Sequence, residues 1–183
     1  MVRFSFRMNI HPLFVHFPIA LLAIYAIMEL IHTDRLNHSD TYAAIKGFLV
    51  IVGTLAAYVT LSTGELAEGL VLANRPELAK IVETHSAFAG ASTAIFSILA
   101  ISYVIKFFMD STYAHAPVLA SAPLSRVWSA MLWYSRAIRE NVLGQMLALA
   151  GIVCITITGG LGAAIVYGPD VDPLVRVIYG MFF

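Results

Sequence analysis

The 183-residue sequence is 60% hydrophobic and 12% charged, and its mean hydropathy is +0.83. Because soluble domains carry about 25% charged residues, this composition excludes an ordinary soluble domain and indicates an integral membrane protein. The 11 basic and 11 acidic residues balance, which excludes the basic surface of a nucleic-acid-binding protein. The single cysteine, Cys154, excludes an internal disulfide and the C-x-x-C-H attachment of a c-type haem.

Four segments each hold close to the roughly 20 apolar residues that cross a bilayer. They predict transmembrane helices over 12–31, 43–62, 85–108 and 142–167. We therefore predict an all-α fold, an integral membrane four-helix bundle that forms one domain over residues 1–183. Pro18 lies inside the first span and removes a hydrogen bond from the carbonyl of Phe14, which predicts a local kink. Membrane helices tolerate such a kink where a neighbour or a cavity satisfies the freed carbonyl.

The links between the spans differ in length and character. The link 63–84 is polar and predicts a short surface helix starting near Pro76, and the tail after residue 168 is too short to span and is expected on the bilayer surface. The long third link predicts an amphipathic helix over about 124–140 that carries Trp128 and Trp133. Its apolar face comprises Val127, Met131, Tyr134 and Ile138. This pattern is typical of an interfacial helix, and a docking surface for a partner subunit has the same pattern.

Four antiparallel spans bring their ends together on two sides. We call side A the side on which the first span begins, the second ends, the third begins and the fourth ends. Histidines, glycines and hydroxyl residues gather at side A, whereas side B has no comparable set and Glu29 is expected near the lipid headgroups. Six lysines and arginines fall on side B and five on side A, which favours a cytoplasmic side B and a periplasmic side A in a bacterial inner membrane.

The stretch NIHPLFVHFPIA, residues 9–20, places His16 inside the first span. An ionisable side chain at that depth is a site hypothesis by default. Ala20 shares a helical face with His16, and Ala89 shares one with His85 on the third span, so small side chains leave room for a flat ligand beside each imidazole. Other candidate site residues lie at the side A end of the fourth span, namely Thr158, Gly159 and Tyr167.

Two imidazoles from two helices match the axial ligands of a b-type haem. In this interpretation His16 and His85 ligate the iron, and Thr158 or Tyr167 supplies a further hydrogen bond. The protein would pass single electrons near side A, with a quinone or a cytochrome as partner. It would act as a subunit or partner of a respiratory-type complex rather than as a stand-alone enzyme.

Two alternatives stay open from the residues. One is a bare metal site formed by His16 and His85 with Glu65 or Glu68, since zinc or copper needs three or four converging ligands. The other is a non-catalytic structural or assembly subunit, in which the histidines bond to backbone carbonyls or threonine hydroxyls and tie helices together. His11 is most simply a helix-start residue near water. No GxSxG, Walker-type or HExxH motif appears.

Four segments carry a family resemblance: HPLFVHFPIAL in the first span, STGELAE after the second, the Thr84–His85 pair, and GGLGAAIVYGPDVDP at the end of the fourth. Together they resemble the bacterial predicted membrane proteins catalogued as domain of unknown function 2231. The resemblance implies a four-helix membrane domain in which His16 and His85 match the characteristic histidines of the family, with His11 also matching. It further implies an association with respiratory and cytochrome-like proteins. Glu65 departs from the aspartate or tryptophan common near that turn.

Overall fold

The computed structural model describes residues 10–31, 33–110 and 122–183, and Arg3 and Arg7 lie outside them. The described chain is helical, and four of its helices are long and apolar enough to cross a membrane. These are α1 (His11–Leu30), α3 (Asp40–Asn74), α4 (Ala79–Met109) and α6 (Val142–Tyr167). Four shorter helices are α2 (Asp34–Asn37), η1 (Pro76–Leu78), α5 (Ala122–Arg139) and α7 (Pro173–Gly180). The predicted all-α bundle of a multi-pass membrane protein is confirmed.

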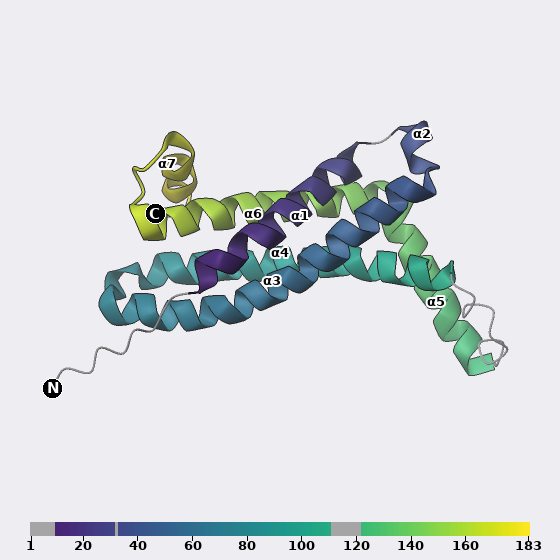
Figure 1. The fold of residues 1–183 in the computed structure, drawn as a ribbon, viewed down its shortest axis with the longest axis horizontal. Coiled ribbons are helices and arrows are strands. Elements are labelled where there is room, and N and C mark those ends of the chain that lie inside the picture. The colour runs from purple at the N-terminus through teal and green to yellow at the C-terminus, as the bar shows by residue number, and fades with distance from the viewer. Residues whose placement is uncertain (1–9, 32, 111–121) are drawn as a thin grey trace.

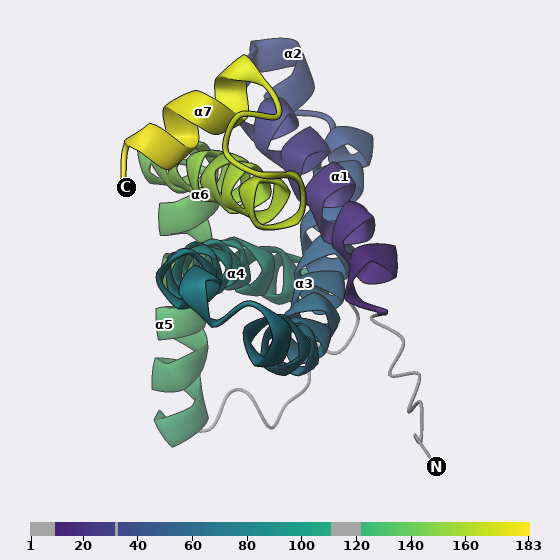
Figure 2. The same ribbon diagram turned by 90° about the vertical axis from the view of Figure 1, so that its left-hand side faces the viewer.

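The four long helices occupy the corners of a bundle. α1 packs on α3 and α6, and α4 packs on the same two helices. Seen end-on from side A, α1 therefore lies diagonally across from α4, and α3 lies across from α6 (Figure 2). The centre of the bundle holds Leu22, Tyr25, Val50, Phe96 and Leu99, which are almost fully buried.

Glycines on α3 and α6 face large side chains from the other helices. A Cβ on Gly53 would lie 2.7 Å from Leu22 of α1, and one on Gly151 would lie 2.7 Å from the Phe96 ring of α4. Gly47 meets Phe107 of α4 in the same way. The large side chains of α1 and α4 thus pack directly on the backbone of α3 and α6 at these glycines, where a side chain would leave no room.

The link predicted over 63–84 is mostly helix, because α3 continues to Asn74 and α4 begins at Ala79 (Figure 1). The sequence STGELAEGLVLAN is less apolar than the span before it, yet it contains good helix formers. The length of an apolar run therefore indicates how much of a helix lies in the bilayer, and it does not indicate where the helix ends. At 1.5 Å per residue, α3 is about 52 Å long against a hydrocarbon core of about 30 Å.

Pro18 lies within α1, and the carbonyl of Phe14 that it leaves without a helical donor finds one on α3. The Thr60 hydroxyl of α3 is 3.3 Å from the Phe14 oxygen, and it also lies 2.9 Å from the Ala56 oxygen of its own helix. A hydroxyl of the neighbouring helix thus donates to the carbonyl that Pro18 leaves without its usual helical donor. This contact ties the first turns of α1 to α3 near side A.

The tail, too short to span the bilayer, forms α7, which packs against the end of α6. Asp172 caps α7 by accepting a hydrogen bond from the Val175 amide at 2.9 Å. Val175 and Ile178 are buried, and Ile178 lies over Gly160. This packing covers the side A end of α6.

Candidate functional site

His11 lies at the start of α1 and contacts the neighbouring corner of the bundle. Its Nδ1 is 3.1 Å from the Thr63 hydroxyl of α3, and its ring lies 3.2 Å from the position that a Cβ of Gly64 would take. The Thr63 hydroxyl donates to the carbonyl of Thr60 at 2.9 Å. Its oxygen is then open to accept from His11, in the tautomer that carries the proton on Nδ1.

His85 lies about two turns inside α4, deeper than a helix-start position, because α4 begins at Ala79. Its Nδ1 is 2.9 Å from the backbone carbonyl of Thr158 on α6. Its ring lies 3.2 Å from the position of a Gly162 Cβ, also on α6. A carbonyl only accepts, so Nδ1 of His85 donates, and in the neutral imidazole the lone pair is on Nε2.

The two histidines have matching arrangements. Each is held through Nδ1 by an oxygen of an adjacent helix, and each ring lies against a glycine of that same helix. His11 and His85 come from the diagonal pair α1 and α4, whereas Gly64 and Gly162 come from the other diagonal. Both imidazoles therefore lie at the side A end of the bundle, each held by a helix of the other diagonal.

His16 has a different placement. It lies on the outward face of α1 and is exposed, as is Ala20 one turn further on. Residues five apart are rotated by about 140° around a helix, so His11 and His16 cannot both face the interior. The structure does not bring His16 to His85, contrary to the expectation that both reach one interior volume.

The other predicted site residues do not gather around the histidines. Ala89 is partly buried, and its carbonyl accepts hydrogen bonds from Ser92 and Thr93. Thr158 reaches His85 through its backbone carbonyl, while its hydroxyl donates to the Cys154 carbonyl. Gly159 faces open space, and Tyr167 is 75% exposed. Of this set, only the backbone of Thr158 touches a histidine.

The bare metal site is not formed in the structure. Within the described ranges, no three side chains of the His, Cys, Asp or Glu type converge closely enough to hold a metal ion. Glu65 is exposed and Glu68 is only partly buried. Zinc or copper held by His16, His85 and one of these carboxylates therefore has no support in the geometry.

Side B holds a buried charged cluster that the sequence analysis did not predict. Glu29 is 6% exposed, and its Oε2 lies 3.0 Å from Nζ of Lys46 on α3. The Tyr103 hydroxyl of α4 donates to the same oxygen at 3.1 Å. Glu29 therefore lies inside the bundle rather than among the headgroups, and it links three of the four corner helices.

Two aromatic side chains complete this cluster. Tyr25 is fully buried and packs edge-on against the Tyr103 ring, and its hydroxyl is within electrostatic reach of Glu29. That hydroxyl makes no hydrogen bond of good geometry to the part of the chain that the structure describes. The guanidinium of Arg139 lies over the Tyr103 ring at 6.0 Å. The sequence signal was a pair of opposite charges, Glu29 and Lys46, at the side B ends of two successive spans.

Comparison with protein-family models, with curated proteins and with solved structures gave no match. The resemblance to domain of unknown function 2231 stays a prediction. The geometry of His11 and His85 is therefore the observation from which a function is inferred.

Proposed function

We propose that the protein is a membrane-bound electron carrier that holds a b-type haem between His11 and His85. The observation that carries the proposal is the common arrangement of the two imidazoles. Both are held through Nδ1 by oxygens of adjacent helices, which in the neutral form places the lone pair of each ring on Nε2. Hydrogen bonding of the second nitrogen is the usual way in which proteins orient histidine ligands.

The donor set fits haem better than a bare ion. If a haem were bound, His11 and His85 would be the side chains that hold it, offered by two diagonal helices of the bundle. Gly64 and Gly162 keep the other two corners free of side chains beside the imidazoles. When bound, the group would supply one-electron chemistry; the chain would hold and orient the two rings and keep the surroundings apolar.

The proposal includes a location and partners. We place the protein in a bacterial inner membrane with side A toward the periplasm, the orientation that the small excess of basic residues on side B favours. A quinone from the bilayer or a cytochrome at side A would exchange electrons with the protein. A place as a subunit or partner of a respiratory-type complex is what the family resemblance implies.

A reduced-minus-oxidised absorption spectrum tests the proposal. The full chain is produced in cells supplied with a haem precursor, purified in detergent and compared with three alanine variants. We expect sharp α and β bands and about one haem per chain in the wild type, since two imidazoles give low-spin iron. His85→Ala and His11→Ala are each expected to lose these bands or shift them to high-spin features.

His16→Ala is the matched control, because it removes an imidazole from the same helix five residues from His11. Its spectrum is expected to equal that of the wild type. Loss of the bands in His16→Ala with retention in His11→Ala would contradict the assignment of the ligands. A wild-type chain without bands after haem supplementation would contradict the proposed function.

A structural role is the second candidate, and the hydrogen bond from His85 to Thr158 favours it, since it joins α4 to α6. In that case, His85→Ala lowers the yield and the unfolding midpoint, and neither the variant nor the wild type has a haem spectrum. Measuring helicity and thermal unfolding on the same samples separates the two candidates.

A further inference from the structure

α5 runs across the side B ends of the bundle rather than along it. Figures 1 and 2 show this helix crossing the long helices at a steep slant, and it packs on α4 and α6. Because the long helices cross the membrane, a helix that crosses them steeply at one end runs closer to the plane of the membrane surface than to the membrane normal. The predicted amphipathic helix over about 124–140 therefore has the orientation of an interfacial helix.

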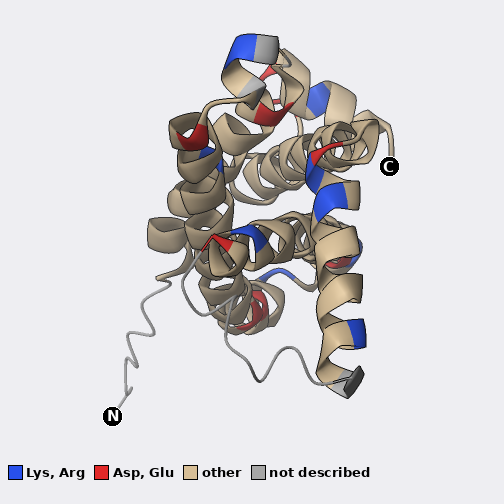
Figure 3. Ribbon diagram, turned by 90° about the vertical axis from the view of Figure 1, so that its right-hand side faces the viewer, with Lys and Arg blue, Asp and Glu red and all other residues tan. Residues whose placement is uncertain are grey.

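The two faces of α5 differ. Ile138 and Ser135 are buried against the bundle, and Val127 and Met131 continue this apolar side along the exposed part of the helix. The opposite side carries Arg126 and Arg136, and basic positions line α5 in the view from side B (Figure 3). The acidic residue that follows the helix, Glu140, lies 4.0 Å from Arg139. The outward side of α5 therefore has unbalanced positive charge.

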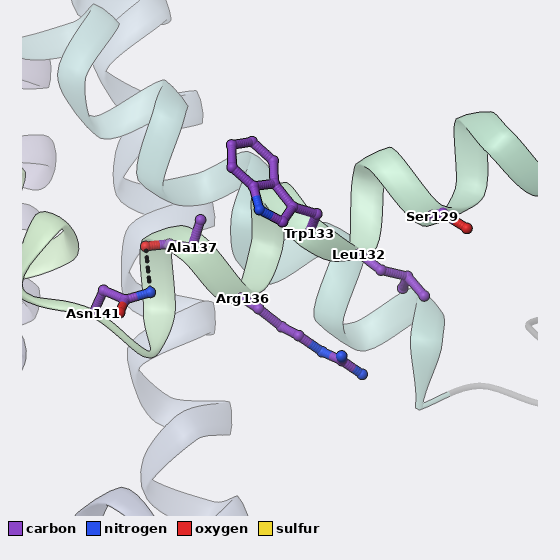
Figure 4. Close-up of a pocket in the computed structure, with 6 residues that line it drawn as sticks. All are labelled: Ser129, Leu132, Trp133, Arg136, Ala137 and Asn141. Atoms are coloured by element: carbon purple, nitrogen blue, oxygen red, sulfur yellow. Dashed lines mark hydrogen bonds between the residues drawn. The ribbon is translucent and has the colours of Figure 1, made fainter.

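A shallow hollow of about 400 Å³ lies on this outward side. Its lining is Ser129, Leu132, Trp133, Arg136, Ala137 and Asn141. Trp133 and Arg136 leave the helix in different directions, and the Asn141 amide donates to the Ala137 carbonyl at the helix end (Figure 4). Trp133 is 73% exposed, which is unusual for so large a ring unless a partner or an interface covers it.

Two side chains of this hollow have no polar or aromatic partner within the described ranges. Neither the Arg136 guanidinium nor the Trp133 indole forms a hydrogen bond, an ion pair or a ring contact there. The Asn141 amide has a second N–H beyond the one that bonds to Ala137. The lining of the hollow thus includes a guanidinium, an indole and an amide, which are donor groups of the kinds that bind a phosphate group.

We propose that this hollow binds the phosphate group of an anionic phospholipid from the side B leaflet. The guanidinium of Arg136 pairs with the phosphate, Trp133 lies at the level of the headgroups, and Arg126 adds positive charge nearly three turns away on the outward side of α5. A lipid fits better than a protein partner because α5 crosses the side B ends of the long helices, where headgroups are expected. Basic residues near a membrane surface attract anionic lipids by this mechanism.

Native mass spectrometry of the full chain tests the proposal. The protein is released from nanodiscs made of phosphatidylcholine with one fifth phosphatidylglycerol, and the adducts of each lipid are counted. The wild type is expected to retain phosphatidylglycerol in excess of its share. Arg136→Gln is expected to reduce this excess about fivefold, the effect of one basic residue near an anionic surface, and Arg136→Lys to keep part of it because the charge stays.

Arg176→Gln is the control, since Arg176 is an exposed arginine on α7 at side A. It is expected to leave the adducts unchanged. Equal retention of the two lipids by the wild type, or an unchanged excess in Arg136→Gln, would overturn the proposal. So would abolition of the excess by millimolar inorganic phosphate, which would indicate a site for the free anion, or the binding of a protein at α5 without any lipid preference.

Discussion

Glu29→Ala is expected to destabilise the bundle by about 3–5 kcal/mol, the usual cost of removing one partner from a buried ion pair. The substitution leaves the Lys46 ammonium, whose side chain is 12% exposed, without its carboxylate. It also leaves the Tyr103 hydroxyl without its acceptor. The free energy of unfolding, measured by titrating the detergent-solubilised protein with a denaturing detergent and following helicity, checks this value.

A double variant and a surface variant make the Glu29 result interpretable. Glu29→Met with Lys46→Leu replaces the pair by apolar side chains of similar size, and it is expected to recover most of the loss because no charge stays unpaired. Asp110→Ala breaks the more exposed pair with Lys106 and is expected to cost less than about 1 kcal/mol. If Glu29→Ala cost no more than Asp110→Ala, the cluster would not be a structural link.

Gly144→Ala is expected to destabilise the protein by about 1–3 kcal/mol, the cost of overpacking a filled interior. The added Cβ would overlap the backbone carbonyl oxygen of Ile138, at the turn from α5 to α6. A backbone atom cannot rotate away as a side chain can, so α5 or α6 has to shift. Thermal unfolding of the purified variant measures the loss.

Gly159→Ala is the matched control for Gly144→Ala, because Gly159 lies in the same helix and a Cβ there meets nothing within 4 Å. Alanine is the better helix former by about 1 kcal/mol, so this variant is expected to be as stable as the wild type or more stable. Equal losses in the two variants would show that helix propensity or general perturbation, rather than the Ile138 carbonyl, decides the result.

The sequence predicted the long helices well because each span is a continuous apolar run of bilayer length. It did not predict where α3 ends and α4 begins, because helix formers continue past Ser62 and precede His85 while hydropathy falls. The same limit applies to α7: its packing on Gly160 depends on a contact with α6 that local sequence does not describe.

Which histidine of the first span faces the interior could not be predicted from the local pattern. His11 and His16 are about 140° apart around α1, and apolar residues flank both. The rotation of α1 is fixed by contacts with α3. His11 bonds to the Thr63 hydroxyl and packs on Gly64, and the Thr60 hydroxyl donates to the Phe14 carbonyl. Such contacts between distant residues carry no signal within a window of one helix.

The glycines of α3 and α6 also bear on how the spans find one another. Helices that have inserted separately into a bilayer can slide and rotate before they associate, and lipid supplies no hydrophobic force to select one alignment. Sliding α4 by one residue would move Phe96 off Gly151 and onto a neighbour that carries a Cβ, and α1 meets the same obstacle with Leu22 at Gly53. The glycines therefore fix the axial register of α1 and α4 relative to α3 and α6 when the helices associate. This happens before the polar contacts at either end of the bundle are made.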